Sequence, residues 1–271
     1  MNTDLPLARV SLRAPLPARG YPFTLRAARL LDDLEFRAGV TFLVGDNGSG
    51  KSTVLEAVAL AAEAIVLSAL PGAHDDLTDA RPLADLLRLS WTRRTRRGFF
   101  LRAEDFLGLA RRTRALTTEF EAAVEALRAE LGDGPDFVRA AAPYRNQLAG
   151  LRAAERAGGT HARSHGERFL DAFQRRLAPG GLYLLDEPEV ALSPQRVLAL
   201  MTLLRRAERE GAQFLIATHS PVLLAHPGAV ILDLDHDPVR EAAYDDLDHV
   251  RFTRDFLSAP ERFLRHLDEE E

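Results

Sequence analysis

The segment Gly45-Asp-Asn-Gly-Ser-Gly-Lys-Ser52 matches the pattern G-x-x-x-x-G-K-[ST]. Glycines let such a loop curl so that successive backbone N–H groups point inward, where they can hold phosphate oxygens. A lysine in this position reaches the β- and γ-phosphates of a nucleotide, and the following hydroxyl binds Mg²⁺. The pattern therefore predicts a catalytic Lys51, Ser52 as a metal ligand, and nucleotide binding by Gly45, Asp46, Asn47, Gly48, Ser49, Gly50, Lys51, Ser52 and Thr53.

Lys51 is the only lysine among the 35 basic residues of the chain. An ammonium group is a compact point charge with three donors, whereas a guanidinium group is a wide planar fork. In a chain that otherwise uses arginine, this single lysine indicates a narrow site that admits only the ammonium group. The alternative is the chance survival of one lysine.

Two further polar groups each follow an apolar run. Leu182-Tyr-Leu-Leu-Asp-Glu187 ends in two carboxylates, and Ala217-Thr-His-Ser220 follows a second run. Beside a phosphate-binding loop, Asp186 is placed to hold Mg²⁺ and Glu187 to polarise the attacking water as a general base. His219 could contact the γ-phosphate. Acidic turns after strands and lone histidines are common, so both interpretations depend on the upstream loop.

The elements that must position these groups alternate between strand and helix. Such alternation predicts an α/β fold with a largely parallel sheet flanked by helices, and ligands at the carboxyl ends of its strands. A small antiparallel edge sheet is expected from Arg9–Arg13 and Leu30–Phe36. The expected core strands are Val40–Val44, Gly181–Leu185, Ala212–Ala217 and Ala229–Asp233, and the expected helices are Thr53 to about Leu70, Glu167–Leu177 and Pro194–Arg209.

The middle of the chain has a different pattern. Apolar residues recur at helical spacing from Asp105 to Leu131, where Gly132-Asp-Gly-Pro135 breaks the run. The chain is therefore expected to divide into an N-terminal half of the core (1–72), a mostly helical subdomain (73–160) and a C-terminal half of the core (161–271). A short helix is expected from Arg262 to Glu271.

The overall composition excludes several classes of protein. The formal net charge is −5, so the total charge does not indicate a polyanion partner such as a nucleic acid. Cysteine is absent, so neither a disulfide framework nor a thiolate metal site is predicted. No apolar stretch is long enough to span a membrane, and the first residues do not form a signal peptide. A cytoplasmic protein is expected.

The three motifs together resemble the Walker A, Walker B and switch-histidine motifs of ABC-type ATPases. Ser164-His-Gly-Glu167 lies 22 residues before Asp186 and resembles the Leu-Ser-Gly-Gly-Gln signature of that family. The resemblance implies a P-loop NTPase core of ABC type with a helical insert, ATP and Mg²⁺ as cofactors, and an ATP-dependent homodimer. In such a dimer, Ser164 and Gly166 would close the partner's nucleotide site.

Departures from the transporter pattern favour a soluble, non-transporter branch. Arg163 replaces the signature leucine, and Glu189-Val-Ala-Leu-Ser-Pro194 is similar to the AAA-type ATPases related to chromosome-maintenance and DNA-repair heads. The client is then a nucleic acid or a protein, with DNA maintenance or defence among the candidate tasks. The alternatives are the ATP-binding subunit of a transporter, which needs a membrane partner, and a nucleotide-gated binding module for DNA or a protein.

The sequence leaves three assignments open: the glutamine-loop residue, the residue that stacks on adenine, and the role of a basic cluster. No glutamine loop is evident, so Glu104 or Arg102 could replace it, with Gln147 a weaker candidate. Tyr21 or Phe23 could stack on adenine, although core packing is the commoner role of such residues. A basic cluster beside Trp91 could bind a nucleic-acid backbone or form an ordinary solvated surface; its members are Arg93, Arg94, Arg96 and Arg97.

Overall fold

The computed structural model describes residues 5–67, 75–157 and 165–265. Within this part of the chain, a seven-stranded sheet has the order β10-β9-β3-β8-β7-β6-β4, parallel except for β10 at its edge. Its strands are β3 (Val40–Val44), β4 (Ile65–Val66), β6 (Gly98–Arg102), β7 (Leu182–Asp186), β8 (Gln213–Ala217), β9 (Val230–Asp233) and β10 (Arg240–Glu241). The expected largely parallel sheet is confirmed.

A second, antiparallel sheet of three strands lies against the first, in the order β2-β1-β5. Its strands are β1 (Leu7–Leu12), β2 (Asp33–Glu35) and β5 (Leu87–Trp91). The expected strand Leu30–Phe36 is shorter than predicted, because the 3₁₀ helix η1 (Arg26–Asp32) occupies its first half. The small antiparallel sheet itself is confirmed.

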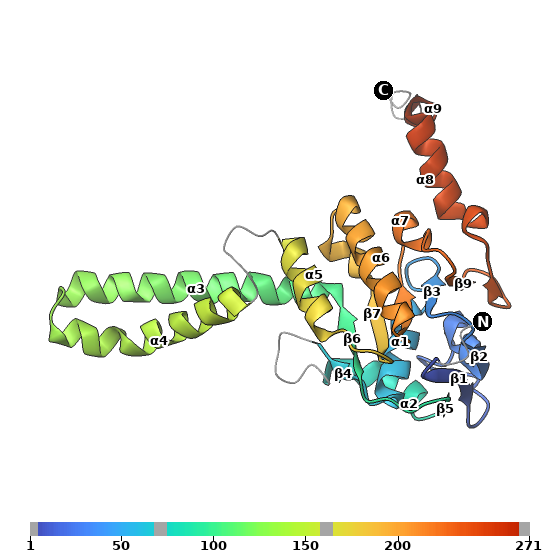
Figure 1. The fold of residues 1–271 in the computed structure, drawn as a ribbon, viewed down its shortest axis with the longest axis horizontal. Helices are drawn as coiled ribbons and strands as arrows, with labels where there is room; N and C mark the ends of the chain where they lie inside the picture. The colour runs from blue at the N-terminus through green and yellow to red at the C-terminus, as the bar shows by residue number, and fades with distance from the viewer. Residues whose placement is uncertain (1–4, 68–74, 158–164, 266–271) are drawn as a thin grey trace.

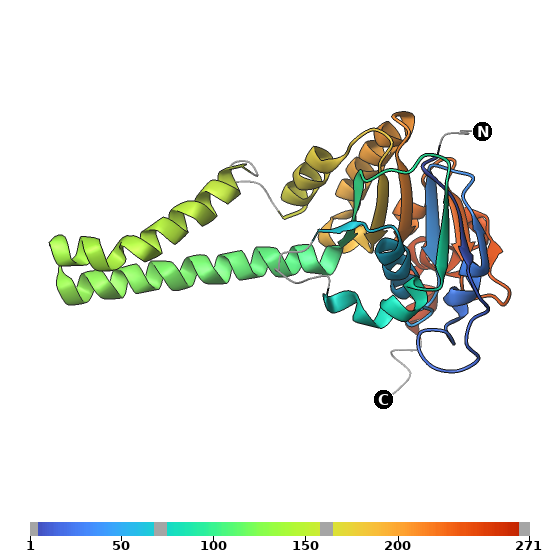
Figure 2. The ribbon, with the colours of Figure 1, turned by 90° about the horizontal axis from the view of Figure 1, so that it is seen from below.

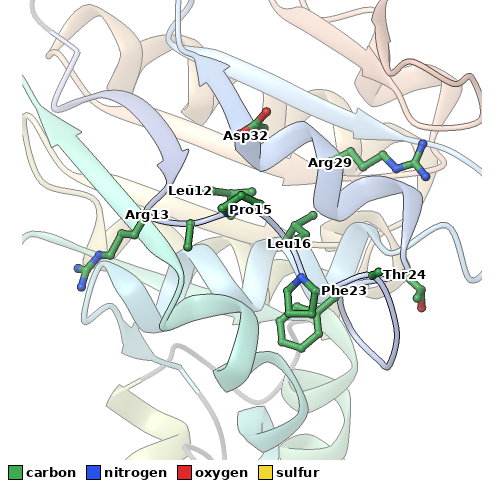
Figure 3. Close-up of a pocket in the computed structure, with 11 residues that line it drawn as sticks. Leu12, Arg13, Pro15, Leu16, Phe23, Thr24, Arg29 and Asp32 are labelled. Carbon is green, nitrogen blue, oxygen red and sulfur yellow. The ribbon is translucent and has the colours of Figure 1, made fainter.

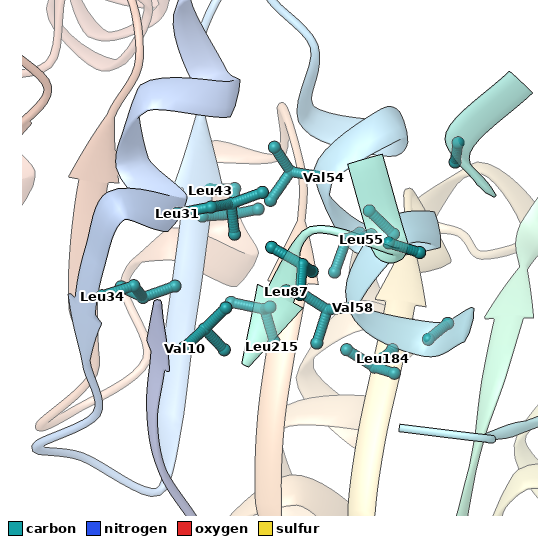
Figure 4. Close-up of a cluster of buried hydrophobic side chains, with 14 of the residues drawn as sticks. Val10, Leu31, Leu34, Leu43, Val54, Leu55, Val58, Leu87, Leu184 and Leu215 are labelled. Atoms are coloured by element: carbon teal, nitrogen blue, oxygen red, sulfur yellow. The ribbon is translucent and has the colours of Figure 1, made fainter. Parts of the chain in front are cut away.

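The helix α1 (Lys51–Ala61) fills the space between the two sheets, and almost all of its side chains are buried. After its polar first turn it is largely apolar, apart from Glu56, because both sheets contact it. Figure 4 shows Val54, Leu55 and Val58 of α1 packed among side chains of both sheets. The predicted extension of this helix to Leu70 is wrong: α1 ends at Ala61, and the β-branched pair Ile65-Val66 forms β4 beside β6.

On the other face of the parallel sheet, two helices cover a second core. These are α5 (His165–Arg176) and α6 (Pro194–Arg209), and the ring of Tyr183 on β7 stacks on Phe214 of β8 beneath them. Helices on both faces of the sheet give the three-layer arrangement expected of an α/β fold (Figure 1). The bounds of α6 agree with the sequence prediction, and α5 begins two residues before its predicted start.

The segment 73–160 is less helical than predicted. It contains the 3₁₀ helix η2 (Asp75–Ala80), the short helix α2 (Arg81–Ala84), and the strands β5 and β6 of the two sheets. Only its second part is a helical insert: α3 (Ala103–Leu131) and α4 (Pro135–Ala157) pack as an antiparallel hairpin that projects from the core (Figures 1 and 2). The division of the chain into the parts 1–72, 73–160 and 161–271 stays a prediction.

The C-terminal part leaves the core as a second projection. It comprises the 3₁₀ helix η4 (Tyr244–Asp246), α8 (Asp248–Ser258) and α9 (Pro260–Leu264), whereas the short helix α7 (Pro221–Leu224) packs on the core with Leu223 and Leu224 buried. The helix predicted from Arg262 to Glu271 begins earlier than expected, at Pro260, and its predicted part beyond residue 265 lies outside the described residues. No described helix has the length and hydropathy needed to span a membrane.

Candidate active site

The phosphate-binding loop connects β3 to α1. Gly50 precedes the helix with φ of 100°, a left-handed conformation that suits glycine, and a Cβ here would approach Ala27 and Leu25. The loop therefore delivers the N-terminal end of α1, with its free backbone N–H groups, to the carboxyl edge of the sheet. This edge is where an α/β sheet binds its ligand.

Lys51 lies in the first turn of α1 and is only 5% exposed. Its Nζ donates hydrogen bonds to the carbonyl oxygens of Gly45 at 2.7 Å and Asp46 at 3.0 Å. Burial lowers the pKa of Lys51, while the carboxylates of Glu187, Asp235 and Asp186 oppose this shift. The carboxylates of the site thus surround the ammonium group of Lys51.

Ser52 and Asp186 meet at the same edge although 134 residues separate them. The Ser52 hydroxyl donates to Oδ1 of Asp186 at 3.1 Å. Burial raises the pKa of Asp186 to about 6; the Ser52 hydrogen bond opposes this shift, and the nearby Glu187 charge adds to it. A cation at this point would oppose the shift, because its positive charge stabilises the ionised carboxylate.

The Ser52–Asp186 pair fits a Mg²⁺ site. Mg²⁺ prefers hard oxygen ligands, and proteins usually hold it with one or two side chains while phosphates and waters supply the rest. The described residues contain no group of three or more His, Cys, Asp or Glu able to hold a metal by themselves. A hydroxyl beside one carboxylate is therefore a set of donors suited to Mg²⁺ carried on a nucleotide.

Glu187 follows β7 in a strained conformation. Its φ is 47°, which non-glycine residues rarely adopt, and its backbone N–H donates to the carbonyl of Ala217 at 2.9 Å. This bond ties the end of β7 to the end of β8, and it turns the Glu187 side chain toward His219, whose Nε2 lies 3.8 Å from Oε1 of Glu187. Strain at such a position is typical of a functional residue.

The sheet order explains why these groups meet. β3, β8 and β7 are adjacent, and their parallel register pairs Leu43 with Ala217 and Ala217 with Asp186. The loop after β3, the histidine after β8 and the acids after β7 must therefore share one edge. The structure brings together Lys51, Ser52, Asp186, Glu187 and His219, as the motifs predicted.

Arg102 is the glutamine-loop candidate that reaches this site. It ends β6 opposite Asp186 in the strand register, and its guanidinium forms an ion pair with Glu56 of α1. Gln147 is exposed on α4 in the projecting hairpin, away from the sheet edge. Nothing is described of the Glu104 side chain.

The signature residues are described only in part. Ser164 lies outside the described residues, and Gly166 is buried in the first turn of α5. A Cβ on Gly166 would approach Cδ of Arg196 at 2.7 Å, so this position has a packing reason to be glycine. Arg196 in turn donates to Glu167 at 2.9 Å and fixes α5 on α6.

Of the two aromatic candidates, Tyr21 lies closer to the phosphate-binding loop. It is 57% exposed, and its hydroxyl is 3.0 Å from Oγ1 of Thr53 in α1. Phe23 packs against the core and lines a hollow of about 850 Å³ with Leu12, Pro15 and Leu16 (Figure 3). The phosphate-binding loop contributes no residue to that hollow.

The basic cluster lies at the opposite edge of the sheet from the acids. Arg93, Arg94, Arg96 and Arg97 occupy the loop that precedes β6, whereas Asp186 faces the end of that strand. With Pro179, Gly180 and Glu210 they line a hollow of about 490 Å³. Arg97 donates to the Pro179 carbonyl at 3.2 Å, and Arg94 lies 3.8 Å from Glu63.

Asp235 is an acid of the site that sequence reasoning missed. Asp235 follows β9, and its Oδ1 accepts the backbone N–H of Asp46 at 2.8 Å. It thereby fixes the start of the phosphate-binding loop and adds to the negative field around Lys51. The sequence signal was its place just after a strand that pairs with β3, but that pairing was not predicted.

The chain matches one family over the segments that carry this site. The sequence profile of the family described as "AAA domain, putative AbiEii toxin, Type IV TA system" matches residues 40–131 and 168–225. The first segment includes the phosphate-binding loop, and the second includes Asp186, Glu187 and His219.

A curated relative matches over a shorter stretch. The cytochrome c biogenesis ATP-binding export protein CcmA of Rhodospirillum rubrum is 38% identical over 86 residues, which are 28% of this chain and 36% of CcmA. The chain thus spans about a third of that relative's length.

Solved structures with a similar fold include a Smc head domain with an extended coiled coil, bound to the C-terminal domain of ScpA, from Pyrococcus furiosus. It has a TM-score of 0.42 and 14% identity, with 97% of this chain and 99% of that chain covered. Another is cbiO1 from Clostridium perfringens, part of an ABC transporter complex, with a TM-score of 0.42, 16% identity, and 88% and 90% coverage. The family match covers more than half of the chain: the protein belongs to this AAA domain family and is a P-loop ATPase.

Proposed function

We propose that the protein hydrolyses ATP in a Mg²⁺-dependent manner and that the nucleotide cycle drives dimerisation and a conformational change. The observation that carries the proposal is the meeting of five side chains at one sheet edge. Ser52 lies 3.1 Å from Asp186, Glu187 lies 3.8 Å from His219, and Lys51 is buried at the centre of their charges.

The residues divide the work by position. The loop amides and Nζ of Lys51 bind the triphosphate; for this, Nζ exchanges its bonds to the Gly45 and Asp46 carbonyls for phosphate oxygens. Ser52 Oγ and an Asp186 oxygen would hold Mg²⁺, which supplies positive charge to the phosphate oxygens when bound. Tyr21, beside Thr53, is the better placed of the two aromatics to contact adenine.

Glu187 is the group assigned to the attacking water. Its carboxylate accepts a proton as the water oxygen bonds to the γ-phosphorus, and the bond from that phosphorus to the bridging oxygen of ADP breaks. His219 Nε2 is buried without a hydrogen-bond partner among the described residues, so it is available to a γ-phosphate oxygen. Catalysis would come mainly from positioning and charge.

The experiment that tests the proposal is the Glu187→Gln variant. It keeps the shape of the site but cannot take the proton, so we expect ATP binding to persist, turnover to fall by roughly 100-fold or more, and an ATP-bound dimer to accumulate. ATP binding and phosphate release are measured side by side on the variant and the parent chain. Turnover at the parent rate would show that Glu187 is not the general base.

Two features bear on the client. The hairpin of α3 and α4 begins directly after Arg102, so it is the element best placed to transmit a change at the site. A nucleic acid bound at the basic cluster would sit at the far edge of the sheet and would not contact the nucleotide. We propose that the hairpin, and not the basic cluster, contacts the client.

The alternative is the ATP-binding subunit of a transporter. The local match to CcmA, which is an ATP-binding export protein, favours it. It requires a separate membrane partner, so co-purification of an integral membrane protein with the tagged chain, at a stoichiometry that survives detergent, is the test.

A further inference from the structure

The Glu189 side chain connects the segment after β7, which carries Glu187, to the loop after β8, which carries His219. It belongs to η3 (Pro188–Ala191), directly after Glu187, and it turns back toward the loop that follows β8. Its Oε1 accepts three hydrogen bonds from consecutive residues: the Thr218 hydroxyl at 2.6 Å, the His219 backbone N–H at 2.9 Å and the Ser220 backbone N–H at 3.1 Å. Its Oε2 is buried and has no donor among the described residues.

This contact fixes the backbone on both sides of His219. Hydrogen bonds to a carboxylate are shorter and stronger than those between neutral groups. Thr218 is fully buried, its Oγ1 also accepts the Ser220 N–H at 3.0 Å, and the Ser220 side chain accepts the Leu223 N–H at 3.2 Å. The loop is therefore held at three successive residues, which fixes the backbone position from which the His219 side chain starts.

η3 also contacts elements beyond the site. It packs against the hairpin helix α3 and against α5, which carries Gly166 of the signature segment. The Glu189 carboxylate thus connects the base of the hairpin to the histidine loop through a short, rigid segment. A shift of η3 would be passed to the His219 backbone by all three hydrogen bonds.

We propose that Glu189 is a positioning residue for ATP hydrolysis, which aims His219 at the γ-phosphate by holding the backbone from Thr218 to Ser220. The inference rests on the proposed function, because it assumes that His219 acts on the γ-phosphate. Glu189 itself touches neither nucleotide nor water in this assignment. Its effect reaches the reaction through His219.

The test compares Glu189→Ala with Glu189→Gln. Alanine removes the acceptor, so kcat falls by roughly 10- to 100-fold, while KM for ATP stays near its original value because the phosphate-binding loop is intact. Glutamine keeps a carbonyl oxygen that can accept the same three hydrogen bonds, and it restores most of the lost kcat. Glu261→Ala, at an exposed carboxylate on α9, serves as the matched control and leaves kcat unchanged.

A double-mutant cycle with His219→Ala shows whether the effect passes through the histidine. If Glu189 only aims His219, Glu189→Ala causes no further loss of kcat once the imidazole is gone. Losses that simply multiply, or a higher KM at unchanged kcat, would overturn the proposal. Losses that multiply are what a merely structural role of Glu189 would give, because the effect of Glu189→Ala would then not depend on the imidazole.

A substitute variant and a separate test of the proposed function complete the experiment. If Glu189→Ala does not fold, Thr218→Val removes one of the three donors while keeping the carboxylate, and it is expected to show the same split between kcat and KM. Glu187→Gln, in the chain with an intact Glu189, tests the proposed function separately. Wild-type turnover in that variant would refute the proposed function, whatever Glu189 does.

Discussion

Asp186 is held in the protein at a cost to folding. Burial raises the pKa of its carboxyl to about 6, from an ordinary value of 3.8. The native state therefore binds a proton more tightly than the unfolded chain between these pH values. The stabilisation that protonation provides is fully present below pH 3.8, and it is lost as the pH rises through about 6.

We expect Asp186→Asn to be more stable than the parent chain at pH 8 and in the presence of a chelator. The amide resembles the protonated acid, so the gain should approach ~3 kcal/mol above pH 6 and shrink toward zero near pH 4. Urea unfolding across this pH range measures it. Stability differences that did not change with pH would contradict the raised pKa.

The matched control is Asp136→Asn, at an exposed carboxylate in the first turn of α4. This control keeps Asp186, so the difference in unfolding free energy between it and the parent chain should not show the pH dependence expected for Asp186→Asn. With Mg²⁺ and ATP present, the order should reverse, because only the parent chain has the carboxylate that holds the cation and gains stability from ligand binding. Comparing the unfolding free energies with and without ligand thereby distinguishes the destabilisation that the buried Asp186 causes from its role in binding Mg²⁺.

At the scale of elements, the site depends on how closely β6 approaches β7. Gly98 begins β6 with φ of 124°, and a Cβ at this position would collide with the backbone carbonyl of Leu182. This glycine lets β6 enter the sheet, and β6 in turn places Arg102 opposite Asp186. The geometry at the far end of the strand therefore depends on a residue four positions earlier.

We expect Gly98→Ala to lower the free energy of unfolding by at least roughly 1–3 kcal/mol, from the backbone strain alone. Urea titration followed by circular dichroism measures it. Gly150→Ala, in open space within α4, is the control and should gain about 0.5–1 kcal/mol, since alanine suits a helix interior better. Equal stabilities of the two variants would show that the Gly98 contact is relieved at no cost.

The same strand shows where sequence reasoning reached its limit. β3, β7 and β8 are continuous apolar runs that end in polar motifs, and they were predicted to within a residue. Gly98–Arg102 is also largely apolar, but it lay inside the segment predicted to be mostly helical, and its partner strand β7 is distant in the sequence. Local patterns predict elements well, whereas pairing depends on distant segments.

The site divides in the same way. Lys51, Ser52, Asp186 and Glu187 lie in motifs whose spacing reflects their chemistry, so they could be recognised one by one. Asp235 and Glu189 act as hydrogen-bond acceptors for backbone groups 189 and 30 residues away. Their importance follows from the loops they hold, and no residue pattern near them describes those loops.

At the scale of the whole molecule, two projections leave one compact core. The hairpin of α3 and α4 extends from the core on one side, and α8 with α9 extends in another direction (Figures 1 and 2). The hairpin ends at Ala157 and α5 begins at His165, so the predicted signature segment follows the hairpin closely in the sequence. A partner subunit that contacted this segment would therefore sense the state of the hairpin.

We expect Ser164→Arg to prevent the ATP-dependent dimer of the Glu187→Gln chain while leaving ATP binding by the monomer intact. In a dimer closed through Ser164 and Gly166, an arginine side chain would occupy the space of the partner's γ-phosphate and would lack room in a closed interface. Light scattering with ATP and Mg²⁺ gives the mass, and calorimetry gives the affinity for ATP. Ser258→Arg, at an exposed position on α8, introduces the same residue away from the signature and should still dimerise. If the Ser164→Arg chain dimerised as readily as this control, the signature segment would lie outside the interface, and the hairpin would have to be coupled to the nucleotide within a single subunit, through Arg102 and η3 alone.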